Sequence, residues 1–148
     1  MFEVHKKDME ILRELAEDSR KSYREIARKL GIATSTVMNR VNVMKKEGVI
    51  KSSTLHLDHE KLGYSLTALI EITVAKGKMI EIENKIAKNP NVYAVYDITG
   101  EMDAAILARF KNRKELNGFV KSLLATEFIE RTNTHLVLNV IKEEYSMF

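Results

Sequence analysis

Polar side chains that can hydrogen-bond to nucleobases recur at helical spacing shortly before residue 47. Ser35 and Asn39 are four residues apart, and Thr36 and Arg40 follow them one position along. Asparagine pairs with adenine through two hydrogen bonds, arginine does the same with guanine, and hydroxyls bind bases or phosphates. We therefore expect Ser35, Thr36 and Asn39 at base edges of duplex DNA and Arg40 at a base or a phosphate. The alternative is a solvated helix face without a ligand.

The segment around these residues is basic, whereas the 148-residue chain as a whole carries a net charge of only +3. Ser19–Lys51 holds nine basic and two acidic residues, a net charge of +7, and Met1–Asp18 has a net charge of −3. A positive field confined to one segment is what binding to phosphates requires. The flanking cations, taken singly, are equally well explained as ordinary surface charges. The full set of predicted DNA contacts is Ser22, Tyr23, Arg24, Thr34, Ser35, Thr36, Asn39, Arg40, Asn42, Lys45, Lys46 and Lys51.

Three short helices are predicted to hold these side chains in place. The first covers Lys7–Glu17. The second begins near Tyr23, because Ser22 and Glu25 have the spacing of a capping box, and it ends at Gly31, a residue that tolerates positive φ. This arrangement predicts a helix-turn-helix, whose second helix fits the major groove of B-DNA.

The third helix is predicted to run from about Thr34 to Glu47. Val37, Val41 and Met44 form its buried stripe, and Gly48 stops it. An extended segment, a candidate wing or linker strand, should follow from Val49 through Leu57. We divide the chain into a winged helix-turn-helix domain, a linker strand and a second domain, at residues 1–51, 52–64 and 65–148.

From residue 65 onward the apolar residues alternate, which is typical of strands. The predicted elements are a strand over Ser65–Val74, a helix over Lys78–Lys88, strands over Val92–Ile98 and Ala104–Phe110, a helix over Arg113–Leu124 and a strand over Thr132–Lys142. The order βαββαβ indicates an α+β, ferredoxin-like sandwich with both helices on one face of an antiparallel sheet. The other face, with Leu69, Tyr93, Val95 and Val137, has no helix to cover it, so we expect a homodimer, sheet against sheet.

With both halves considered, the chain resembles the Lrp/AsnC (feast/famine) family of transcription regulators over essentially its whole length. The matching residues are Asp8, Ile11-Leu12, Leu15, Asp18-Ser19-Arg20, Ile26-Ala27, Leu30-Gly31, Val37, Arg40-Val41, Gly48-Val49-Ile50, Leu62-Gly63-Tyr64 and Gly100-Glu101-Met102-Asp103. The resemblance implies a winged helix-turn-helix joined to a βαββαβ effector domain. It also implies dimers formed through the effector domains, frequent assembly into octamers and frequent response to amino acids.

Two positions depart from the family pattern. Ala33 stands where a serine commonly caps the recognition helix, so Thr34 or Ser35 is expected to take that role and to shift the helix start by a residue. The effector loop commonly reads Gly-Asp-aromatic-Asp, whereas this chain has Glu101 and Met102.

The candidate effector site is the loop Thr99-Gly100-Glu101-Met102-Asp103. Gly100 lets backbone N–H groups approach a carboxylate, and Asp103 is suited to accept an ammonium group. The family fold would bring the hydroxyls of Thr132 and Thr134 near this loop. The alternative is a plain β-hairpin turn in which the glycine relieves strain and the aspartate caps the turn.

Other classes of function find little support in the sequence. His56 and His59 would point to opposite faces of an extended segment, so no metal site is expected. Neither a phosphate-binding glycine-rich loop nor a nucleophile motif is present, so we expect neither an enzyme nor a cofactor. The chain has no cysteine and no apolar run of membrane-spanning length, which favours a cytoplasmic location away from membranes.

The sequence thus predicts a sequence-specific, DNA-binding transcription regulator with a small effector, such as an amino acid, bound between subunits. The alternative is an architectural DNA-binding protein without an effector. It would discriminate weakly between sequences and show a steep dependence on salt.

Overall fold

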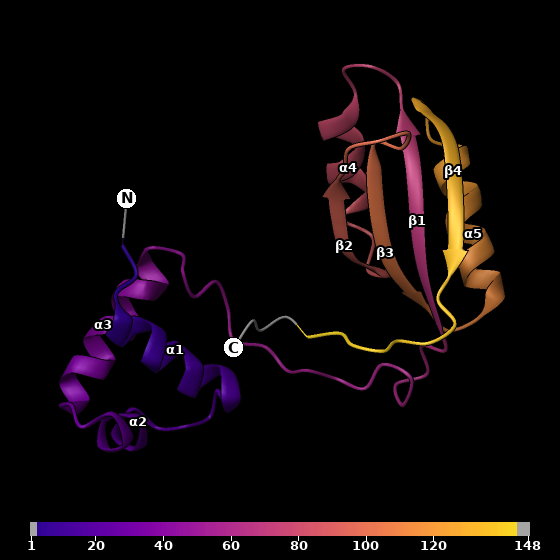
Figure 1. Ribbon diagram of the computed structural model, residues 1–148. Helices are drawn as coiled ribbons and strands as arrows, with labels where there is room; N and C mark the ends of the chain where they lie inside the picture. The colour runs from indigo at the N-terminus through magenta and orange to yellow at the C-terminus, as the bar shows by residue number, and fades with distance from the viewer. Residues whose placement is uncertain (1–2, 145–148) are drawn as a thin grey trace. The chain divides into compact units, whose positions relative to one another are not determined.

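The computed structural model describes residues 3–144, and Figure 1 shows their helices and strands. The chain divides into two compact units. Among the described residues, one unit comprises 3–56 and 142–144, and the other spans Leu57–Ile141. Each unit has its own apolar core.

The first unit contains the helices α1 (Lys6–Glu17), α2 (Tyr23–Leu30) and α3 (Thr34–Lys46). The predicted capping box at the start of α2 is present. The Ser22 hydroxyl accepts the Glu25 N–H at 3.2 Å, and Glu25 Oε2 accepts the Ser22 N–H at 2.7 Å. Gly31 ends α2 in the left-handed conformation with φ of +65°, as predicted.

The start of α3 differs from the expectation that Thr34 or Ser35 would cap it. Ala33 occupies the N-cap position without a side-chain hydrogen bond, and the helix begins at Thr34. The Ala33 carbonyl accepts the N–H groups of Thr36 and Val37, at 3.0 and 3.3 Å. Backbone bonds and the buried Val37 therefore define the first turn, so the helix start is not shifted.

The wing or linker strand expected from Val49 through Leu57, and placed in residues 52–64, is absent from the part of the chain that the structure describes. Gly48, with φ of +73°, ends α3, and the Ile50 N–H turns back to the Met44 carbonyl at 3.1 Å. No regular structure follows until turns at 59–63. A strand needs a neighbour, and within the described residues of one chain this segment pairs with none, so the wing or linker strand stays a prediction.

The second unit is an antiparallel four-stranded sheet with two helices, in the predicted order βαββαβ. Its elements are β1 (Leu66–Val74), α4 (Met79–Ile86), β2 (Val92–Asp97), β3 (Ala104–Phe110), α5 (Arg113–Leu124) and β4 (Ile129–Leu136). The strands lie in the order β2-β3-β1-β4, so β1 is central. Both helices lie on the same side of the sheet (Figure 1).

The core of this unit lies between the sheet and those helices. Ile70 and Ile72 of β1 and Ile106 of β3 are fully buried there, and the rings of Phe110 and Phe119 pack at 5.4 Å between centroids. The alternate residues of β1 and β3 point to the other, open face, as the period of two requires.

Two predictions about the sheet were wrong. The last strand was expected over Thr132–Lys142, but β4 covers Ile129–Leu136, because its pairing with β1 runs from Val74↔Ile129 to Ala68↔Leu136. Val95 was expected on the open face, but it packs against the core. A bulge between Val92 and Ala94 shifts β2 by one residue and places Val95 opposite Ile106.

Candidate DNA interface and effector loop

The exposed face of α3 carries the predicted base-reading side chains. Val37, Val41 and Met44 are buried in the core of the first unit, at 0–1% exposure. Ser35 and Asn39 lie on the exposed side of the helix together with Thr34 and Asn42, and Thr36 is half-buried. The helix therefore presents hydroxyl and amide groups to the outside, in an arrangement that suits a groove floor.

Arg40 has a different environment from the one predicted. Its Nη1 donates to both carboxylate oxygens of Asp8 in α1, at 2.9 and 3.0 Å. The Asp8 side chain is 1% exposed and that of Arg40 is 36% exposed. A buried carboxylate needs a nearby cation, so Arg40 connects α3 to α1. The contact of Arg40 with a base or a phosphate stays a prediction beside this pairing.

The Asp8 carboxylate is held in its charged form. Burial by itself would raise the pKa of Asp8, but the hydrogen bonds from the His5 N–H and the Arg40 guanidinium outweigh it and lower the pKa below its ordinary value. The His5 N–H reaches Asp8 Oδ2 at 3.0 Å, so Asp8 also closes the first turn of α1. One buried carboxylate thus joins the start of α1 to the middle of α3.

The predicted phosphate contacts divide into two groups. The side chains of Arg24, Lys45, Lys46 and Lys51 are exposed, as a contact to DNA requires. The two side chains at the α2 N-terminus already have partners within the protein. The Ser22 hydroxyl bonds to Glu25, and the half-buried ring of Tyr23 packs against the core. Arg20, just before α2, pairs with Asp18 at 3.0 Å.

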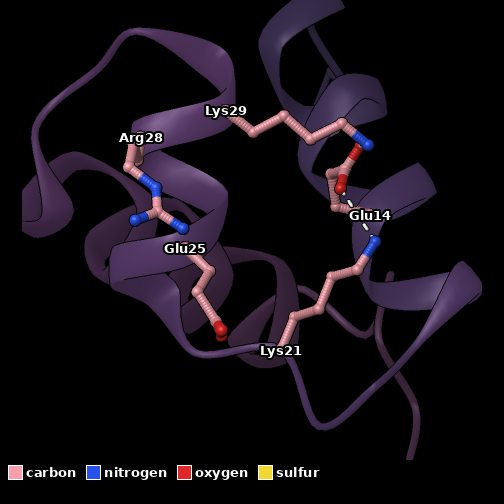
Figure 2. A pocket seen from close by; sticks show the side chains of 5 residues that line it. All are labelled: Glu14, Lys21, Glu25, Arg28 and Lys29. Atoms are coloured by element: carbon pink, nitrogen blue, oxygen red, sulfur yellow. Dashed lines mark hydrogen bonds and ion pairs between the residues drawn. The ribbon is translucent and has the colours of Figure 1, made fainter.

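Glu14 of α1 is the centre of an ion-pair cluster that the sequence analysis missed. Figure 2 shows it between Lys21 and Lys29, whose Nζ atoms lie 2.9 and 2.6 Å from its carboxylate oxygens. Lys21 also contacts Glu17 at 2.5 Å. Both lysines hold the pKa of Glu14 below its ordinary value. The charges of these two lysines are therefore neutralised. The positive charge of the segment Ser19–Lys51 comes from its other basic residues.

A signal for this cluster exists in the sequence. Glu14 follows Ile11 by three residues, so it lies on the same side of α1 as the apolar stripe and is 8% exposed. A carboxylate placed at the margin of a core requires cations from neighbouring elements. Lys21 and Lys29 are the cations that the turn and α2 bring to it.

The loop Thr99-Gly100-Glu101-Met102-Asp103 joins β2 to β3 and is fixed to the central strand. Asp103 Oδ2 accepts the Val74 N–H at 2.8 Å, and the Asp103 N–H donates to the Ile72 carbonyl at 2.9 Å. Met102 is 8% exposed, and its sulfur accepts a hydrogen bond from the Thr73 hydroxyl at 3.5 Å. Thr99, Gly100 and Glu101 remain exposed.

Thr132 and Thr134 do not adjoin this loop within one chain. They lie on β4 opposite Ile72 and Ile70 of β1. The loop enters β3, which pairs with the opposite edge of β1. The two parts of the candidate site are thus one strand apart, roughly 10 Å.

In residues 3–144 no group of three or more histidine, cysteine, aspartate or glutamate side chains is arranged to hold a metal ion. His59 lies in a turn and its ring contacts Tyr64 edge to face. None of the helices described is long and apolar enough to cross a membrane.

Comparison with known proteins matches both units to families. Residues 5–51 match a winged helix-turn-helix DNA-binding domain, and residues 67–147 match the Lrp/AsnC ligand-binding domain. Together these two domains define a helix-turn-helix transcription regulator that carries a ligand-binding domain, a class of DNA-binding protein and not of enzyme. The chain belongs to the Lrp/AsnC family of transcription regulators, which confirms the resemblance seen in the sequence.

Relatives of this chain align along nearly its full length. It is 46% identical to an uncharacterised HTH-type transcriptional regulator of Pyrococcus furiosus, and the alignment covers 99% of both chains. It is 38% identical to the HTH-type transcriptional regulator FL11 of Pyrococcus horikoshii, over 92% of this chain and 90% of that protein. The fold is similar to that of a feast or famine regulatory protein from M. tuberculosis complexed with L-methionine. The TM-score is 0.89 at 23% identity, over 97% of this chain and 98% of the other.

Proposed function

We propose that this regulator binds duplex DNA sequence-specifically in the cytoplasm, with α3 in the major groove. The observation that carries the proposal is the division of α3 into a buried apolar stripe and an exposed polar face. Ser35, Asn39 and Asn42 would contact base edges, with Thr34 and Thr36 beside them. Arg24, Lys45, Lys46 and Lys51 would contact phosphates and set the register without reading sequence. Ser22 and Tyr23, at the α2 N-terminus, would lie beside the phosphates.

We further propose that the protein acts as a homodimer, which could assemble into an octamer. Support comes from the open face of the sheet, where Leu69 and Leu107 lie opposite each other on neighbouring strands. On the same face Glu71, Asn133 and His135 bond to one another at 2.9–3.2 Å. A second copy of this face would cover the apolar centre. Two DNA-binding units would then read half-sites one helical turn apart, about 34–36 Å.

The proposed effector is an amino acid bound at the loop 99–103. Support comes from the exposed backbone around Gly100, which suits a carboxylate, and from the M. tuberculosis neighbour, whose structure contains L-methionine. Since Asp103 already accepts the Val74 N–H, the exposed Glu101 would supply the acceptor for the ammonium group. Thr132 and Thr134 lie one strand away, so they would contribute from a second subunit.

Selection of binding sites from random duplex DNA, with and without each of the twenty amino acids, tests this proposal. We expect one two-fold symmetric motif, and an amino acid that changes the affinity or the assembly state. Isothermal titration of that amino acid should then show binding that Glu101→Ala abolishes and Thr54→Ala, in the linker, preserves. Binding without any recovered motif or ligand response would favour an architectural protein instead.

A further inference from the structure

The recognition helix α3 exposes two large apolar side chains. Within Lys6–Lys46, which the structure describes throughout, the exposed large apolar residues are Met38 and Val43, at 45% and 43%. Both belong to α3, and neither contributes to the core. Single exposed apolar residues are common on protein surfaces. Met38 and Val43, however, both lie on the helix that is proposed to enter the DNA groove. The groove would cover them there.

Met38 is adjacent to the proposed base-reading residues. It follows Ser35 by three positions and precedes Asn42 by four, and residues at these separations are neighbours on a helix surface. It therefore lies on the flank of the helix, between the polar strip and the buried stripe. Lys45, seven positions on, continues the same side toward the end of the helix.

Position along α3 favours Met38 over Val43 as a base contact. A recognition helix contacts base edges mainly with its N-terminal residues. Met38 lies in the second turn of α3, together with Asn39, whereas Val43 lies in the third. Val43 also follows Arg40, which Asp8 holds toward α1. Met38 is thus the apolar side chain that would reach deepest into the groove.

The major groove offers one apolar partner at base edges, the C5-methyl group of thymine. A methionine side chain is flexible and polarisable, so it adapts to the position of a methyl group. The polar neighbours Ser35, Asn39 and Asn42 can hydrogen-bond but cannot recognise a methyl group. An apolar contact would therefore add information that the polar strip lacks.

We infer that Met38 is a specificity residue that reads a thymine in each half-site through contact with its C5-methyl group. The inference rests on the proposed function, because it requires α3 to lie in the major groove. It goes beyond that function because it assigns a thymine contact to Met38, a side chain that the proposed hydrogen bonds to bases do not include.

Replacement of thymine by deoxyuridine tests the inference, since it removes the methyl group and keeps the base pair. The full-length protein is bound to its selected duplex, and each thymine of one half-site is replaced in turn. Wild-type protein should lose about fourfold in affinity at one position, the value of one buried methyl group. Met38→Ala should be nearly insensitive at that position, whereas the matched control Val43→Ala should retain the wild-type response.

The outcomes separate this inference from the proposed function. Equal sensitivity of wild-type protein and Met38→Ala at every thymine would overturn the inference while DNA binding stands. So would a wild-type protein that ignores every thymine methyl group. Failure to select any duplex would overturn the proposed function and the inference with it. Because Met38 lies outside the core, thermal unfolding of Met38→Ala should match that of wild-type protein, and Met38→Gln, which keeps the length, provides a second variant.

Discussion

Arg40 of the recognition helix and the buried Asp8 of α1 form an ion pair across 32 residues of sequence, with both carboxylate oxygens within 3.0 Å of Nη1. The pair joins the polar face of the DNA-binding unit to its first helix. Arg40 therefore holds α3 against α1. Part of its effect on DNA binding should for this reason be indirect.

Substitution of Arg40 should destabilise the first unit. Arg40→Gln leaves the buried Asp8 carboxylate with the His5 N–H but without its cation, at a cost of about 2 kcal/mol. This cost is below the roughly 3–5 kcal/mol expected for breaking a fully buried ion pair, because Arg40 is 36% exposed. Hydrogen exchange of the α1–α3 amides measures this cost locally, whereas one melting temperature would mix two units.

A double-mutant cycle with Asp8→Asn separates the ion pair from other effects of Arg40. If the two side chains act through each other, Arg40→Gln should cost much less in the Asp8→Asn background. An equal cost in both backgrounds would show that the effect of Arg40 on stability does not depend on Asp8.

The lowered pKa of Asp8 predicts how the stability of the first unit depends on acid. Burial opposes the shift, but the His5 and Arg40 hydrogen bonds prevail, so the folded-state pKa lies below the unfolded value. The stabilisation is thus complete above the unfolded pKa, near 4, and is lost as the pH falls through the folded pKa. The difference in stability between wild-type protein and Asp8→Asn should stay constant from about pH 7 to about pH 5 and shrink as the pH falls below about 4. A difference that stays constant in that acidic range as well would contradict the assignment.

The ends of α2 and α3 could be predicted because local chemistry defines them. Ser22 and Glu25 start α2, and the glycines at 31 and 48 adopt positive φ at the helix ends. The partner of Arg40 could not be predicted, because the pairing depends on how α1 packs against α3. Helical periodicity placed Arg40 on a flank of the exposed face, and tertiary packing supplied a buried carboxylate there.

Glu14→Gln should loosen the packing of α1 against α2. It removes the charge that holds Lys21 and Lys29 (Figure 2), whereas Glu17→Gln removes a carboxylate whose side chain is 66% exposed. Hydrogen exchange of the α1 and α2 amides should quicken in Glu14→Gln and change little in Glu17→Gln, because exposed ion pairs contribute little. Equal effects of the two variants would show that burial of Glu14 does not matter.

Neutralising Lys45 and Lys46 should weaken binding to all DNA sequences alike. If both contact phosphates, the slope of log K against log salt should fall in magnitude by about 2 in the double glutamine variant. Lys21→Gln is the matched control, since Glu14 and Glu17 already bind its ammonium group, and its slope should change less. A double variant with the wild-type slope would remove these lysines from the interface.

Non-local pairing also explains the errors in the second unit. Leu136, Leu138 and Val140 alternate as a strand would, yet the register with β1 ends at Ala68↔Leu136, so Leu138 lies beyond the strand at 87% exposure. Val95 was assigned to the wrong face because the bulge in β2 is a property of its pairing with β3. The order βαββαβ along the chain, in contrast, followed from alternation and turn residues alone.

The most direct test of the placement of α3 at base edges is the effect of Asn39→Ala on discrimination between DNA sequences. The ratio of affinities for the selected duplex and for a random duplex is measured for both proteins at one salt concentration. In Asn39→Ala the ratio should fall by about tenfold, with one base of each half-site no longer distinguished, while binding to random DNA is unchanged. An unchanged ratio in Asn39→Ala would contradict the placement of the polar face of α3 at the base edges.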